Sequence, residues 1–110
     1  MAAMRGHPYP RGKGALMYFV LLYDYVDDVA ERRPQFREEH LSAVSAHVER
    51  GEIIMAGAWA NPMDGAAVVF RCEDRSLAER FVEHDPYVKN GLVPSWRIRE
   101  WTVVAGTALE

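Results

Sequence analysis

The sequence predicts an α+β domain of the ferredoxin-like class, with the order βαββαβ and a four-stranded antiparallel sheet. Three observations carry this prediction. Four short apolar runs alternate with two stretches whose apolar residues recur at helical spacing. Only five residues separate the middle two runs, which is typical of a hairpin. The length of 110 residues suits one domain.

The chain is expected to divide into a flexible N-terminal tail, a folded domain and a short C-terminal tail. Glycine and proline recur through residues 1–16 and interrupt any regular element there. Met17 begins the first apolar run, so the domain is expected over residues 17–104. Residues 105–110 are expected to form the C-terminal tail.

The first half of the domain supplies one strand and one helix. The run Leu16–Tyr25 is apolar and aromatic apart from Asp24, which predicts a buried strand. Pro34 suits the first turn of a helix, and Gly51 is expected to end it. The inward stripe of this helix is predicted to contain Phe36, His40, Leu41, Val44 and Val48.

The second half repeats the pattern after a hairpin. Strands are predicted over residues 52–60 and 66–72, joined by residues 61–65. Ser76 is expected to cap the second helix, with Glu79 completing a capping box. This helix is expected to end near Asp85, because the residue before Pro86 avoids helical geometry. The fourth strand is predicted over residues 94–104.

The first strand is apolar on both sides, whereas two helices cover only one face of a four-stranded sheet. Exposed apolar rows of that size usually mark an interface. A homodimer formed sheet against sheet is therefore predicted. Coverage of the second row by the chain's own tails is the alternative.

Composition excludes several classes of function. The net charge of −3 argues against a nucleic-acid binder, and no apolar run is long enough to cross a membrane. The single cysteine, Cys72, excludes an internal disulfide and fits a cytoplasmic location. Cys72 is interpreted as a core residue rather than a nucleophile.

His40 and Asp85 are the candidate catalytic residues. His40 lies in the middle of the inward helix stripe, and imidazole titrates close to neutral pH, so it can act as a base or an acid. Asp85, at the end of the second helix, can turn back toward the sheet and orient that imidazole. In the alternative interpretation His40 bonds a backbone carbonyl and Asp85 only caps the turn that follows it.

The remaining candidates are weaker. His47 is interpreted as a packing or partly solvated residue and His84 as exposed, and no histidine spacing matches a metal motif, so neither a metal nor a cofactor is predicted. Three aromatic residues are candidates for binding a flat small-molecule ligand: Tyr23, Trp59 and Tyr87. Each of them also fits simple packing.

Three motifs in residues 17–104 together resemble the YciI-like family. They are a histidine within RPQFREEHL, the strand EIIMAGAWA after Gly51, and HDPYVKNGLVPSWRIREW. The resemblance implies a dimeric α+β barrel whose site holds a His–Asp pair, here His40 and Asp85. Most members are uncharacterised, and a related dehydrochlorinase acts on a chlorinated aromatic. This chain departs from the family where a proline commonly follows the second strand, because Ala58 and Trp59 stand there before a short loop.

The leading functional hypothesis is a cofactor-independent enzyme in which His40, oriented by Asp85, moves a proton on a cyclic or aromatic substrate. A lyase-type or dehydrochlorinase-like elimination is the specific expectation. One alternative is a non-catalytic module that binds a small ligand in the same cleft. Another is a purely structural interaction domain in which His40 and Asp85 are framework residues.

Overall fold

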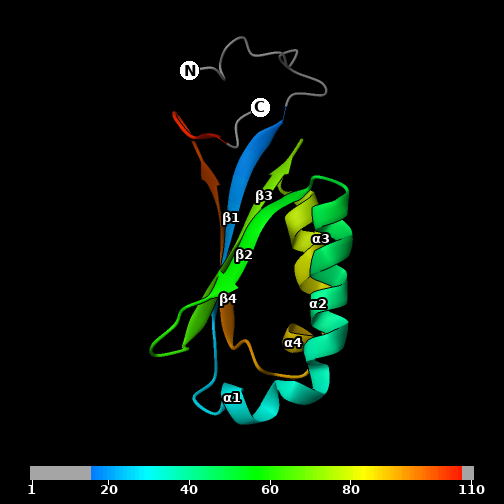
Figure 1. Ribbon diagram of the computed structural model, residues 1–110, viewed down its shortest axis with the longest axis vertical. Helices are drawn as coiled ribbons and strands as arrows, with labels where there is room; N and C mark the ends of the chain where they lie inside the picture. The colour runs from blue at the N-terminus through cyan, green and yellow to red at the C-terminus, as the bar shows by residue number, and fades with distance from the viewer. Residues whose placement is uncertain (1–15, 108–110) are drawn as a thin grey trace.

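The computed structural model describes residues 16–107 and shows one twisted sheet with helices on one face (Figure 1). Residues 1–15 of the predicted N-terminal tail and the last three residues lie outside the described part. The elements are β1 (Met17–Asp24), α1 (Val29–Arg32), α2 (Pro34–Glu49), β2 (Ile53–Ala58), β3 (Gly65–Cys72), α3 (Ser76–His84), α4 (Pro86–Lys89) and β4 (Ser95–Trp101). The predicted ferredoxin-like α+β fold is confirmed.

The sheet has the order β2-β3-β1-β4, and every neighbouring pair is antiparallel. Alternation along β1 sorts its side chains between the two faces. Phe19, Leu21 and Tyr23 are buried under the helices, whereas Val20 and Leu22 are only half-buried on the opposite face. The core therefore lies between the central strands and the helix layer, and the opposite face carries no helix (Figure 1).

The helix α2 packs less deeply than its sequence predicted. None of its residues is fully buried. Leu41 is 43% exposed and Val48 is 48% exposed, so the prediction that they belong to the inward stripe was wrong. With 3.6 residues per turn, both lie roughly a quarter turn away from His40. The face that packs inward is narrower and consists of Phe36, His40, Ala43, Val44 and His47.

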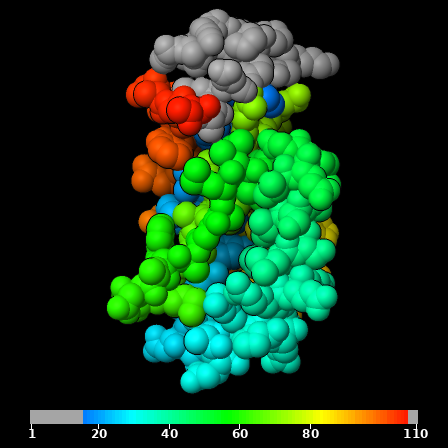
Figure 2. Space-filling model, in the orientation of Figure 1, coloured from blue at the N-terminus to red at the C-terminus, as the bar shows by residue number. Residues whose placement is uncertain are grey.

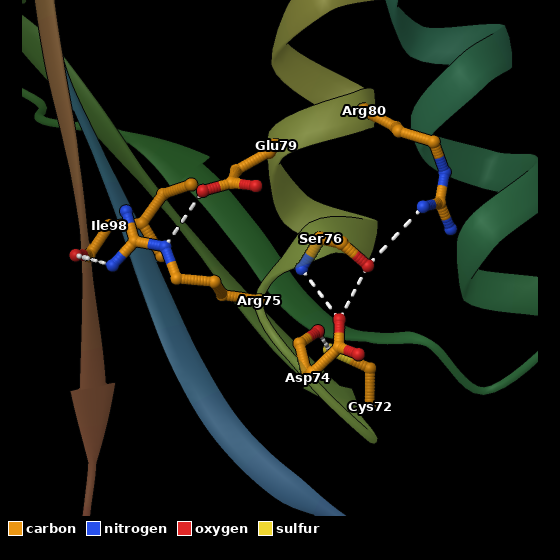
Figure 3. A network of polar contacts seen from close by, with 7 residues as sticks. All are labelled: Cys72, Asp74, Arg75, Ser76, Glu79, Arg80 and Ile98. Atoms are coloured by element: carbon orange, nitrogen blue, oxygen red, sulfur yellow. Dashed lines mark hydrogen bonds and ion pairs between the residues drawn. The ribbon is translucent and has the colours of Figure 1, made fainter.

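The N-cap position of α3 is Arg75, not the predicted Ser76, and the side chain of Arg75 makes no capping hydrogen bond. The Asp74 carboxylate accepts a hydrogen bond from the Ser76 backbone N–H at 2.8 Å and also contacts the Ser76 hydroxyl (Figure 3). The predicted capping box is therefore wrong. Glu79 pairs instead with Arg75, which also donates to the Ile98 carbonyl of β4 (Figure 3). This contact ties the start of α3 to the edge of the sheet.

The end of the fourth strand and the segment after α3 differ from their predictions. The fourth strand ends at Trp101, short of the predicted Val104. The short helix α4 was not predicted. It begins at Pro86, directly after Asp85, whose side chain accepts from the Tyr87 backbone N–H. Pro86 therefore ends α3 and starts α4, and Asp85 stands at the junction of the two helices.

Candidate active site

Asp85 is the one charged residue that is buried in the described part of the chain, with a 1% exposed surface. Its carboxylate accepts three hydrogen bonds. One comes from the Tyr87 backbone N–H at 3.0 Å, and one comes from the Tyr23 hydroxyl at 2.6 Å. The third joins Asp85 Oδ1 to His40 Nδ1 at 2.8 Å. A buried carboxylate needs such partners, because water no longer solvates it.

The structure thus brings His40 and Asp85 into direct contact, although α2 and the α3–α4 junction are 45 residues apart in the sequence. Asp85 caps its own turn as well, so the two interpretations of this residue are compatible. A carboxylate can only accept hydrogen bonds, so in its contact with Asp85 the His40 ring carries its proton on Nδ1. The lone pair of His40 is then on Nε2, the nitrogen that faces away from Asp85.

The imidazole of His40 is held from a second side by Tyr87. The two rings are stacked, with centroids 3.9 Å apart and an angle of 7° between their planes. Tyr87 itself is 2% exposed, and its ring meets that of Tyr25 edge-on. The His40 side chain retains 12% exposure, so it is held firmly but still reaches the surface. Within residues 16–107, Nε2 makes no hydrogen bond.

The surface of the molecule is open between α2 and β2. Figure 2 shows the surface hollowed between these two elements, with blue atoms of the first strand at the bottom. The strand register puts Ala56 and Ala58 of β2 on the helix-facing side, opposite Val68 and Ala66. Both alanines are exposed, whereas their partners on β3 are buried. The small side chains of β2 therefore leave the helix-facing side of the sheet open at this edge.

The pKa values of the three tyrosine hydroxyls in the site are raised above the ordinary value. Burial raises the pKa of Tyr23, and the charge of Asp85 and its hydrogen bond raise it further. Burial also raises the pKa of Tyr25 to about 12 and, in the same direction, the pKa of Tyr87. All three phenols are consequently neutral at physiological pH, so Tyr23 can serve as a hydrogen-bond donor to Asp85.

The three aromatic candidates for ligand binding lie in different environments. Tyr23 is buried and its hydroxyl is bonded to Asp85, a positioning contact that the sequence did not reveal. Tyr87 stacks on His40. Trp59 is 49% exposed after β2, and no contact in the described part joins it to His40 or Asp85. Its indole instead lies against Gly65, where a Cβ would come within 2.9 Å of Nε1.

A second histidine of α2 also meets a carboxylate. His47 Nδ1 lies 2.7 Å from Glu52 Oε1, and Arg50 donates to the same oxygen at 3.0 Å. The ring of His47 packs edge-on against Phe70 and Phe81, as expected of a packing residue. Burial opposes ionisation of Glu52, but the hydrogen bonds from His47 and Arg50 lower its pKa overall. This arrangement ties the end of α2 to the start of β2.

Other candidates are set apart from the site. His84 is exposed, as predicted, and pairs with the Arg80 carbonyl. Cys72 is buried, donates to the Asp74 carbonyl, and has its pKa raised to about 11 by burial, which suits a core residue. Residues 16–107 contain no group of three or more acidic, histidine or cysteine side chains placed to hold a metal. No helix in that range is long and apolar enough to cross a membrane.

Comparison with known proteins identifies the family. Residues 17–102 match the YCII-related domain. The chain belongs to this family. The resemblance inferred from the sequence is thereby confirmed. A comparison with curated proteins gave no match.

Solved structures support the fold. One is a 5-chloro-2-hydroxyhydroquinone dehydrochlorinase from Burkholderia phenoliruptrix, in complex with 2,5-dihydroxybenzoquinone. It is 20% identical, with a TM-score of 0.68 over 78% of this chain and 94% of the other. A nipsnap family protein from Agrobacterium tumefaciens is 13% identical, with a TM-score of 0.57 over 87% and 92% of the two chains. At such low sequence identity, these comparisons show that the chain shares the fold of these proteins.

Proposed function

We propose that this YCII-related protein is a cofactor-independent enzyme in which His40 moves a proton on a small cyclic or aromatic molecule. The observation that carries the proposal is the 2.8 Å contact between His40 Nδ1 and Asp85 Oδ1, with Nε2 left open. A carboxylate on one nitrogen fixes the tautomer and makes the other nitrogen a better base. The Tyr23 hydroxyl and the Tyr87 backbone hold that carboxylate in place.

The specific reaction that we propose is an elimination of the dehydrochlorinase type. With the help of His40, a hydroxyl proton of a chlorinated hydroxyhydroquinone moves to the neighbouring chlorine-bearing carbon, which becomes tetrahedral as the hydroxyl becomes a ketone. His40 Nε2 then takes the proton of the hydroxyl group across the ring from that ketone. The electrons of the broken O–H bond shift through the ring to form a quinone, and chloride leaves with the electron pair of the carbon–chlorine bond. The proton on His40 then passes to water, which restores the base. The dehydrochlorinase in the comparison gives this choice of reaction its support.

The test of this function measures chloride release from chlorinated hydroxyhydroquinones, together with deuterium incorporation into the ring in heavy water. The wild-type protein should do one or both, and His40→Gln should lose them while keeping its circular dichroism spectrum. General acid–base catalysis typically contributes ~10²–10⁴-fold, so the loss is measurable. His84→Gln is the matched control, because this exposed histidine is bonded only to its own helix.

Two results would contradict the proposal. If His40→Gln retained turnover, His40 would not be the base. If the compounds bound beside His40 without any exchange or chloride release over a broad screen, the cleft would instead be a ligand-binding module.

We also propose that the protein is a homodimer whose two sheets close into an α+β barrel. The sheet face without helices carries Val20, Leu22 and Val69, and at its two edges Met55 and Trp101 are 62% and 51% exposed. Apolar surface of this kind in a soluble domain usually marks an interface. A second copy of the same face would cover these residues by two-fold symmetry.

A further inference from the structure

Two arginines lie on the side of α2 that carries His40. Arg33 and Arg37 precede His40 by seven and three residues, which puts all three on neighbouring positions of one helix face. Arg33 is half-buried and Arg37 is exposed. Neither residue was predicted to have a role from the sequence.

Both guanidinium groups lower the pKa values of two tyrosines of the site, Tyr25 and Tyr87. Burial raises the pKa of Tyr87, whereas the positive charges of Arg33 and Arg37 lower it. The same two arginines oppose the rise in the pKa of Tyr25. The Tyr87 ring is stacked on the imidazole, and Arg37 lies three residues before His40 on the same face of α2.

Neither arginine has an acidic partner in the described part of the chain. The ion pairs there involve Arg32, Arg50 and Arg75, but not Arg33 or Arg37. The negative charge of Asp85 is shared among Tyr23, Tyr87 and His40. The surroundings of His40 therefore hold two guanidinium groups and one carboxylate, that of Asp85, and neither guanidinium group forms an ion pair with it. A guanidinium group binds anionic oxygen in preference to neutral groups.

We infer that Arg37, assisted by Arg33, recognises a negatively charged oxygen on the ligand that binds beside His40. Carboxylates, phenolates and enolates share this chemistry. The inference rests on the proposed function for the location of the ligand, but not on any particular reaction. It narrows the substrate class from cyclic or aromatic molecules in general to those that are anionic at neutral pH.

The experiment compares benzoate with benzamide, which have the same shape and differ in charge, and adds 4-nitrophenol above its own pKa as the phenolate. Binding is followed by NMR through the imidazole nitrogens of His40 in ¹⁵N-labelled protein. Benzoate should bind at least ~10-fold more tightly than benzamide, a difference of about 1.4 kcal/mol, and added salt should reduce that ratio. Binding of 4-nitrophenolate shows whether the site accepts a phenolate as well as a carboxylate.

Three variants test whether Arg37 causes the preference for benzoate over benzamide. Arg37→Gln should bring the benzoate-to-benzamide ratio close to one, and Arg37→Lys should restore part of it by returning the charge. Arg80→Gln removes the same charge from an exposed position on α3 and should leave the ratio unchanged. Equal binding of benzoate and benzamide, a ratio that survives in Arg37→Gln, or failure of every probe to perturb His40 would each overturn the inference.

The outcome is separable from that of the proposed reaction. Asp85→Asn should impair proton transfer, yet the guanidinium of Arg37 remains, so the charge preference in binding should persist. A protein that selects anions without turning over any substrate would therefore support the anion site and contradict the enzyme.

Discussion

The imidazole of His40 lies parallel to the phenol ring of Tyr87, with the ring centroids 3.9 Å apart. This stacking and the hydrogen bond to Asp85 restrict the imidazole in two independent ways, one for its plane and one for its rotation. We expect Tyr87→Phe to keep the stack and the orientation of His40. Tyr87→Leu should lose both and lower the free energy of unfolding by about 2 kcal/mol. Denaturant unfolding and the chemical shifts of the His40 ring protons measure the two effects; equal shifts in both variants would contradict the role of the stack.

Asp85 holds the second restraint on His40. Asp85→Asn keeps the shape of the side chain, but it presents an N–H group to donors that expect an oxygen. We expect the free energy of unfolding to fall by about 3 kcal/mol, because buried donors lose a charged acceptor. Activity, once a substrate is found, should fall ~10²–10⁴-fold. Asp64→Asn is the control at an exposed carboxylate. A fully active Asp85→Asn protein would show that the pair is a framework feature only.

The buried phenols predict instability in alkali. The folded-state pKa of Tyr23 is raised by burial and by Asp85, so the stabilisation is complete below the ordinary pKa of about 10 and is lost as the pH rises beyond it. The pKa values of Tyr25 and Tyr87 are raised in the same direction. In Tyr23→Phe one of the three groups is removed, so the loss of stability per pH unit above about pH 10 should be smaller by up to ~1.4 kcal/mol. Urea unfolding at a series of alkaline pH values tests this; identical slopes would refute it.

The helix-free sheet face predicts the oligomeric state. Sedimentation at micromolar concentration should show twice the mass of one chain. Val20 lies on that face, in the middle of β1, so Val20→Asp should dissociate or unfold the protein. Ser42→Asp introduces the same charge at an exposed position of α2 and should leave the dimer intact. A monomeric wild-type protein would remove the basis of the barrel.

The strands and the two long helices could be predicted because alternation and helical periodicity are local properties of the sequence. The helix α4 could not, since its four residues are too few to show a period. The contact of Asp74 with the first turn of α3 was missed because Ser76 is itself a good capping residue, and only the backbone conformation decides where the helix begins.

The candidate site was predictable in part. The helix position of His40 and the Asp-Pro junction at Asp85 pointed to the pair through the family motif. The contact between Tyr23 and Asp85 spans 62 residues and depends on the sheet register, which the alternation along one strand does not fix. The same is true of the stacking of His40 on Tyr87, which depends on how α2 lies against α4.

The shallow packing of α2 has a consequence for the opening motions of the protein. None of its side chains is fully buried, so apolar burial contributes less to holding this helix than it does for α3. Its attachment relies instead on polar contacts near its middle and its end, from His40 to Asp85 and from His47 to Glu52. Segments with little buried apolar surface open with a lower free energy than the core. Native-state hydrogen exchange should therefore be faster in α2 than in the central strands β1 and β3, and His40→Gln should accelerate it further in α2 alone. His40 would thus both move the proton and hold α2 against the rest of the domain. Hydrogen exchange in α2 as slow as in β1 would disprove this.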